Sequence, residues 1–177
     1  MIVIGIDPGT VRTGFGIVRR DGNRLTRLSS GTISTSSKKP MEERLLAIHE
    51  GLDQVLTVSG PEEAAVEDIF FSKNARSALK LGQVRGVILL TLTRREIPIT
   101  SYAPALVKRA VVGSGRAAKE QVGRVVQAIL GLDELPGEDE GDALAIAICH
   151  LNAPRIPAMK APSVSKRPKQ RRPGRTR

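Results

Sequence analysis

The chain has 177 residues, of which 40% are hydrophobic, and it carries one cysteine and a formal charge of +10. This length suits one domain with a full core, and no apolar run is long enough to span a bilayer, so we expect no membrane partner. One cysteine excludes an internal disulfide framework and fits a reducing cytoplasm, and two histidines are too few for zinc sites built on Cys and His.

The positive charge is concentrated at the C-terminal end of the chain. Residues 151–177 contain nine Lys and Arg residues and no acidic residue, which leaves 19 basic and 18 acidic residues before them. Repeated prolines in this segment disfavour regular structure. We therefore expect a nearly neutral folded domain over residues 1–152 and a basic, disordered tail over residues 153–177. Such a tail binds polyanions such as DNA phosphates, or only keeps the chain soluble.

The predicted elements begin with an apolar strand over residues 2–7, which ends where Pro8 removes a backbone donor and Gly9 permits a sharp turn. Two extended segments, 13–19 and 24–33, are joined by an Asp21-Gly22 hairpin and complete an antiparallel meander. Helical and extended patterns then alternate, with helices at 40–58, 73–93, 104–112, 117–130 and 139–151 and strands at 62–68 and 97–102. This order predicts an α/β fold with a five-stranded mixed sheet and helices on both faces.

Two carboxylates stand at the carboxyl ends of buried strands. Asp7 follows the first apolar run, and Glu67 follows Ala64-Ala65-Val66 in the same way. Open α/β sheets place their ligands at this edge, so the two side chains converge if the strands are neighbours. The alternative for Asp7 is a purely structural Asx turn.

The last predicted helix begins with two more candidates, Asp139 and Asp142. Residues three apart share one side of a helix, and this side continues into the core, whereas Glu138 and Glu140 should be rotated away. The alternative is that both aspartates only cap the helix. Four converging carboxylates must take up protons or bind cations, and oxygen ligands without Cys or His favour Mg²⁺ or Mn²⁺. Two such ions catalyse phosphodiester cleavage, so the cluster predicts a metal-dependent nuclease.

Phosphate-binding motifs offer a competing interpretation. The Asp-x-Gly-Thr turn also binds phosphates in actin-like ATPases and sugar kinases, but this chain is too short for their second lobe. Gly113-Ser114-Gly115 is a weak phosphate-loop signal, without a Walker ending. With Arg116 and Lys119 beside it, the loop suits a nucleic-acid backbone phosphate better.

Several motifs with specific joint spacing cover nearly all of residues 1–152. They are residues 5–10 (GIDPGT), 67–70 (EDIF), 73–74 (KN), 77–86 (SALKLGQVRG), 102–104 (YAP), 107–108 (VK), 111–113 (VVG), Lys119 and 139–147 (DEGDALAIA). In these stretches the sequence resembles the RuvC family of Holliday junction resolvases, which have an RNase H-like fold. The tail lies outside the resemblance.

The resemblance implies that Asp7, Glu67, Asp139 and Asp142 hold the catalytic metal ions, and that a homodimer makes paired nicks in four-way DNA junctions during recombination and repair. It further implies that Lys108 and Lys119 contact DNA, that Phe70 stacks at the junction, and that a branch-migration helicase is a partner. An aromatic side chain such as Phe70 suits an unpaired base, and the alternative is ordinary core packing. For the two lysines the alternative is a solvated helix face. The roles of Asp68 and Glu140 stay open.

The segment 75–92 is the candidate dimer surface. Ala78, Gly82 and Gly86 recur every four residues and permit close backbone approach, although the helix could equally pack only on its own sheet. Two other functions stay open: an RNase H-like nuclease acting on RNA-DNA hybrids or linear DNA, and a noncatalytic junction-binding protein. Four intact carboxylates argue against the noncatalytic protein.

Overall fold

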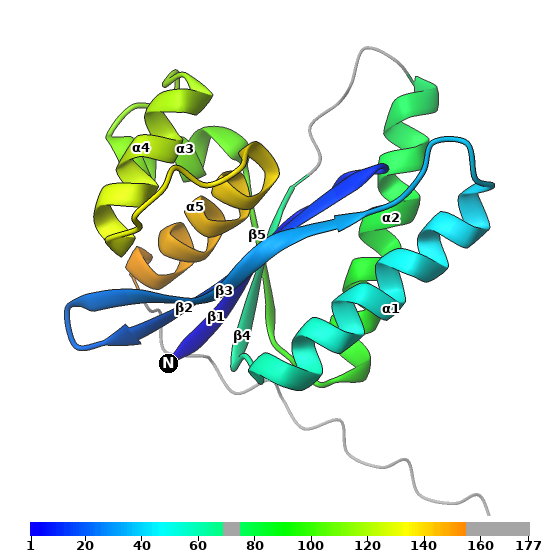
Figure 1. Cartoon of the computed structure of the whole chain (residues 1–177), viewed down its shortest axis with the longest axis horizontal. Coiled ribbons are helices and arrows are strands. Elements are labelled where there is room, and N and C mark those ends of the chain that lie inside the picture. The colour runs from blue at the N-terminus through cyan, green and yellow to red at the C-terminus, as the bar shows by residue number, and fades with distance from the viewer. Residues whose placement is uncertain (69–74, 155–177) are drawn as a thin grey trace, which may run out of the picture.

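The computed structural model describes residues 1–68 and 75–154. Its centre is a five-stranded sheet in the order β3-β2-β1-β4-β5 (Figure 1). The strands are β1 (Ile2–Asp7), β2 (Arg12–Asp21), β3 (Arg24–Ser34), β4 (Glu63–Glu67) and β5 (Ile99–Tyr102). The first three pair antiparallel, and β1, β4 and β5 pair parallel, so the mixed α/β sheet predicted from the sequence is confirmed.

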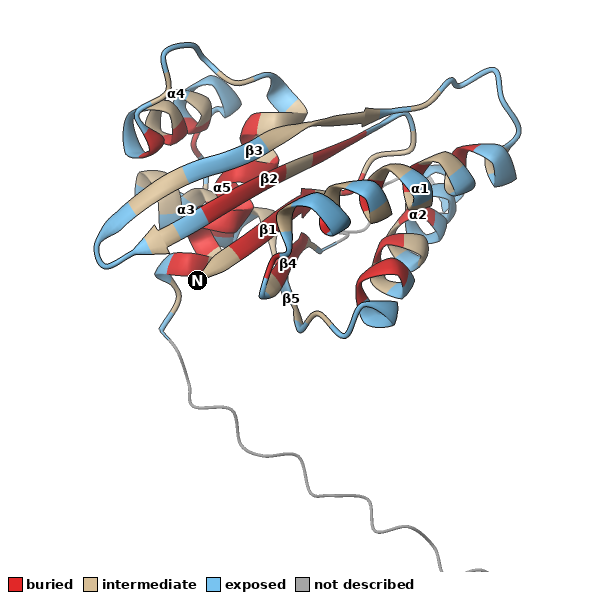
Figure 2. Cartoon of the chain, turned by 60° about the horizontal axis from the view of Figure 1, so that its bottom comes forward, coloured by how far each residue is buried: buried red, intermediate tan, exposed pale blue. Residues whose placement is uncertain are grey.

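Helices cover both faces of the sheet. They are α1 (Met41–Ser59), α2 (Ala75–Arg94), α3 (Pro104–Val112), α4 (Lys119–Leu130) and α5 (Glu138–Asn152). α1 and α2 cover one face and α3, α4 and α5 the other, so buried residues form one core on each side (Figures 1 and 2). Each element lies within a few residues of its predicted range. No described helix is long and apolar enough to cross a membrane.

Glycines on β1 and β2 let α5 lie directly against the sheet. Gly5 and Gly16 are register partners, and Gly14 is the partner of Asp7. A Cβ on Gly14 would lie 2.0 Å from the carbonyl oxygen of Asp139, and one on Gly5 would lie 2.1 Å from that of Ala143. Only glycine permits this approach, which brings the first turn of α5 beside the end of β1.

Two of the sequence predictions lie on residues that the structure does not describe. Phe70, expected to stack on DNA, is within 69–74, and nearly all of the predicted tail is within 155–177. The helix expected at 73–93 is described from Ala75 onwards as α2. The boundary between a nuclease domain and a basic tail therefore stays a prediction.

Candidate active site

The ends of β1 and β4 place two carboxylates side by side. The parallel register pairs Ile6 with Val66, so Asp7 and Glu67 are the next residues on neighbouring strands. Both are partly buried, and Asp7 donates a hydrogen bond to Glu67. They line a cavity of about 220 Å³ together with Asp142, Lys108 and Lys119. The predicted convergence of the two strand ends is present.

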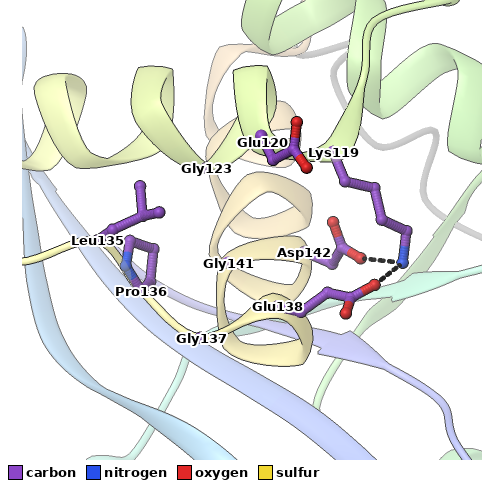
Figure 3. Close-up of a pocket in the computed structure, with 9 residues that line it drawn as sticks. All are labelled: Lys119, Glu120, Gly123, Leu135, Pro136, Gly137, Glu138, Gly141 and Asp142. Carbon is purple, nitrogen blue, oxygen red and sulfur yellow. Dashed lines mark hydrogen bonds and ion pairs between the residues drawn. The ribbon is translucent and has the colours of Figure 1, made fainter.

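The first turns of α5 supply the remaining carboxylates, in two different directions. Asp142 lines the cavity and lies 3.3 Å from Lys119 Nζ, which also lies 2.6 Å from Glu138 Oε1 (Figure 3). Asp139 faces the loop after β1, where its Oδ2 lies 2.7 Å from Arg12 Nε. The helix therefore separates the two aspartates, but both remain near enough to raise the pKa of Asp7.

Glu138 does not line this cavity and its side chain is 66% exposed, as predicted, but the sequence did not predict its contact with Lys119. Glu138 and Asp142 are four residues apart and therefore share a helical side, on which both contact Lys119. Glu140 also faces away from the cavity. Its carboxylate accepts a hydrogen bond, 2.5 Å long, from the Oγ of Ser30 on β3. Asp68, which the sequence left without a role, lies 3.4 Å from Arg85.

The acidic cluster changes the protonation of its members. Burial, followed by the charges of Glu67, Asp142 and Asp139, raises the pKa of Asp7 to about 8. Burial and then Asp142 also raise the pKa of Glu67. The hydrogen bonds and charges of Glu138 and Asp142 raise the pKa of Lys119. At neutral pH this site thus holds a proton between the strand carboxylates and a cation beside the helix carboxylates.

The predicted DNA-binding cations differ in their distance from this cavity. Lys108 and Lys119 line it, and Lys108 Nζ donates a hydrogen bond to the carbonyl of Ala117 at 3.0 Å. Arg116 is exposed in the loop before α4, and it does not line the cavity. That loop begins where Gly113 ends α3 with a φ of 78°.

Sequence reasoning missed three residues that fix the loop after β1. Thr13 Oγ1 donates a hydrogen bond to the Gly9 carbonyl at 2.9 Å, and the buried guanidinium of Arg44 on α1 donates to the Thr10 carbonyl. Arg12 in turn holds Asp139. The contacts of Arg44 and Arg12 join elements far apart in the sequence. The buried arginine also resembles an ordinary polar residue of an amphipathic helix, so no local signal reveals these two contacts.

A divalent metal ion is compatible with the donors present, although the side chains do not surround one in the conformation described. Asp7, Glu67, Asp139 and Asp142 offer carboxylate oxygens, which Mg²⁺ and Mn²⁺ prefer. Within residues 1–68 and 75–154, no group of three or more His, Cys, Asp or Glu side chains is arranged to hold a metal ion. Arg12, Lys119 and the proton of Asp7 satisfy the carboxylates instead.

The fold and the carboxylates at the edge of its sheet place this protein in the class of nucleases with an RNase H-like resolvase fold. Residues 3–150 match the family model described as crossover junction endodeoxyribonuclease RuvC. The chain belongs to the RuvC family of crossover junction endodeoxyribonucleases.

Relatives of the same description match along nearly the whole chain. The RuvC of Citrifermentans bemidjiense is 47% identical over 90% of this chain and 97% of its own length, and that of Sorangium cellulosum is 45% identical over 100% and 99%. The solved structure of Thermus thermophilus RuvC in complex with a Holliday junction substrate is 38% identical, with a TM-score of 0.80 over 85% of this chain and 93% of that one. A fowlpox virus resolvase, 14% identical with a TM-score of 0.54, shares the fold.

Proposed function

We propose that this crossover junction endodeoxyribonuclease hydrolyses phosphodiester bonds of four-way DNA junctions at a divalent-metal site formed by Asp7, Glu67, Asp139 and Asp142. The observation that carries the proposal is the position of these carboxylates at one edge of the sheet, where burial and then the charges of the other three raise the pKa of Asp7. The RuvC of Thermus thermophilus, similar in sequence and fold, was solved with a Holliday junction substrate, which supports the choice of DNA.

The donor set favours Mg²⁺ or Mn²⁺, because all four candidate ligands are carboxylates and the described part of the site offers neither Cys nor His beside them. When bound, two such ions activate water for attack and stabilise the leaving oxygen of the phosphodiester. Binding them requires that Asp7 lose its proton and that Arg12 and Lys119 release Asp139 and Asp142. In the absence of metal, Arg12 and Lys119 therefore neutralise the negative charge of Asp139 and Asp142, and metal ions replace them on binding.

Lys108 and Lys119 then bind the phosphates of the strand to be cut. Both line the cavity that holds Asp7, Glu67 and Asp142, so a phosphate at the carboxylates lies within reach of both ammonium groups. Lysine neutralises a phosphate as a point charge. Phe70 and Arg116 stay predicted DNA contacts, Phe70 because it lies outside the described residues and Arg116 because it lies outside the cavity.

A homodimer fits the symmetry of the reaction, because two nicks at related positions need two identical sites at fixed separation. α2 offers an apolar surface: Leu79 and Leu90 are exposed by 72% and 60%, and nothing lies within 4 Å of a Cβ built on Gly82 or Gly86. The opposite side of the helix, with Val84, Ile88, Thr91 and Leu92, packs on the core. This exposed surface supports α2 as the dimer contact.

A branch-migration helicase as partner and a cytoplasmic location stay predictions from the sequence.

The experiment that tests this function compares cleavage of three substrates, with Mg²⁺ and with EDTA: a four-way junction, a linear duplex of the same sequence and an RNA-DNA hybrid. We expect cleavage of the junction alone, only with metal, and loss of cleavage with retained binding in Asp7→Asn. Equal cleavage of the hybrid would indicate a different RNase H-like nuclease. Junction cleavage that survives in Asp7→Asn would contradict the proposed metal site.

A further inference from the structure

Arg44 is a buried charged residue that the proposed metal site does not use. It belongs to the four buried residues of α1, which recur every four positions, and the other three are Ile48, Leu52 and Leu56. These three pack in the apolar core on the side of the sheet that α1 covers, and Arg44 at the head of the same row is only 6% exposed. The helical pattern therefore favours an apolar side chain at position 44.

The buried guanidinium has few groups that compensate its charge. One of its NH2 groups donates a hydrogen bond to the carbonyl of Thr10. Within residues 1–68 and 75–154 it forms no ion pair with a carboxylate, and its Nε has no hydrogen-bond partner. A buried charge without an ionic partner lowers stability, and an apolar side chain of similar size is commonly as stable or more so. The stability of the fold therefore does not explain the arginine.

The Thr10 carbonyl belongs to the loop that links Asp7 to the first turn of α5. This loop follows Asp7, the last residue of β1, and leads to Arg12 at the start of β2, whose Nε lies 2.7 Å from Asp139 of α5. In the proposed metal site the ions displace Arg12, so this ion pair cannot hold the loop once metal is bound. The contact of Arg44 with Thr10 involves no carboxylate and therefore persists.

Side chains fix this loop through its carbonyl groups. Thr13 Oγ1 on β2 donates to the Gly9 carbonyl at 2.9 Å, and Thr35 Oγ1, just after β3, donates to the Thr10 carbonyl at 3.0 Å. Both threonines lie on or beside the strands that adjoin the loop. Of these three donors, Arg44 alone comes from a helix, so its contact fixes the loop relative to α1 and the core.

We propose that Arg44 is a positioning residue of the nuclease: its contact with the Thr10 carbonyl holds the loop after β1 in place, so that Asp7 meets the carboxylates of α5 around the same metal ions. Arg44 does not line the cavity of Asp7 and acts through the loop. The proposal rests on the proposed function, which assigns Asp7 to metal binding. A displacement of about 1 Å at a reacting group lowers a rate by up to about 100-fold, so removal of the guanidinium should slow cleavage in a protein that remains folded.

The test replaces the guanidinium by an apolar side chain. Arg44→Met removes the donor and continues the apolar row, and Ile48→Met is the matched control at the next position of that row. At the Mg²⁺ concentration that half-saturates wild type, we expect Arg44→Met to cut four-way junctions at least about tenfold more slowly in single turnover. It should also need at least about threefold more Mg²⁺ for its half-maximal rate. Junction binding in EDTA should stay within about twofold of wild type, and the urea midpoint of unfolding should be unchanged or higher. Ile48→Met should stay within about twofold of wild type in rate and in Mg²⁺ requirement.

A wild-type cleavage rate in Arg44→Met would overturn the proposal. Slower cleavage with a lower urea midpoint would also overturn it, because Arg44 would then serve only the stability of the fold. Slower cleavage with an unchanged Mg²⁺ requirement would do the same, because the effect would then lie outside the metal site.

Should Arg44→Met fail to fold, Thr35→Val replaces it, because it removes the other side-chain donor to the Thr10 carbonyl from a half-buried position. We expect about threefold slower cleavage at the same Mg²⁺ concentration, and an unchanged rate would overturn the proposal. A wild type that fails to cleave junctions with Mg²⁺ would instead contradict the proposed function, so the two failures are distinguishable.

Discussion

Asp7 lowers the stability of the metal-free protein as pH rises, although the proposed metal site requires its carboxylate. The fold buries it and surrounds it with three carboxylates, so that its pKa is about 8 and it is protonated at neutral pH. An unfolded chain ionises Asp near pH 4, so folding favours proton uptake between these two values. Without metal, the contribution of Asp7 to stability is thus fully present below about pH 4 and is lost as pH rises towards 8.

Asp7→Asn should therefore stabilise the metal-free protein while it abolishes cleavage. The amide is neutral at every pH and can donate to Glu67 as the protonated carboxyl does. We expect the free energy of unfolding in EDTA to rise by about 1 to 3 kcal/mol at pH 8.5 and to change little at pH 4.5. Urea unfolding at the two pH values measures this difference, and equal effects at both would contradict the burial of an ionisable Asp7.

In the proposed metal site, Arg12 would compete with metal ions for Asp139. Its Nε lies 2.7 Å from the carboxylate, but its side chain is 61% exposed, so the ion pair is weak and can be displaced. Arg12→Ala should strengthen Mn²⁺ binding in the absence of DNA by up to about fivefold. Arg19→Ala, which removes an exposed ion pair with Asp21, is the matched control. Weaker Mn²⁺ binding in Arg12→Ala would show that Arg12 supports the site.

At the residue scale, the sequence could predict the strand-end carboxylates, because an apolar run followed by a breaker reveals where a buried strand stops. It could not predict the partners of Asp139 and Asp142. Glu138 illustrates the reason: its contact with Lys119 depends on how α4 packs against α5, and the helical spacing of α5 alone does not determine that packing.

At the scale of elements, the position of α5 decides whether its carboxylates reach β1. The helix contacts β1 and β2 directly, because Gly5, Gly14 and Gly16 present no side chains to it. The order of elements and the meander were predictable from turns and periodicity. The pairing of β1 with β4 could only be assumed, because these strands are far apart in the sequence. No local sequence pattern indicates that two such strands are neighbours in the sheet.

Gly14→Ala should displace the first turn of α5 and lower the cleavage rate at least about tenfold. The new Cβ would lie 2.0 Å from the carbonyl oxygen of Asp139, and this clash can be relieved only if the backbone moves. Gly31→Ala is the control, because its Cβ meets only the ring of Phe15, at 3.3 Å. Initial cleavage rates with saturating Mg²⁺ measure the effect, together with circular dichroism to verify folding. Equal rates for both variants would show that α5 need not lie so close.

At the scale of the whole molecule, the proposed paired cleavage depends on the proposed dimer of two chains. Leu90→Arg should convert the dimer to a monomer, because it places a charge in the apolar surface of α2. Leu46→Arg, at a 55% exposed position of α1, should leave the dimer intact. Light scattering gives the mass, and the fraction of junctions cut on both strands gives the functional result. A Leu90→Arg variant that stays dimeric would place the interface elsewhere.

The proposed nuclease mechanism requires that carboxylates of β1, β4 and α5 bind metal ions together. Calorimetric titration with Mn²⁺ at pH 7, in two buffers of different ionisation enthalpy, tests it most directly. We predict about two Mn²⁺ ions per chain, release of a proton as Asp7 ionises, and loss of tight binding in Asp7→Asn. Binding that is absent, or that is the same in wild type and Asp7→Asn, would contradict it.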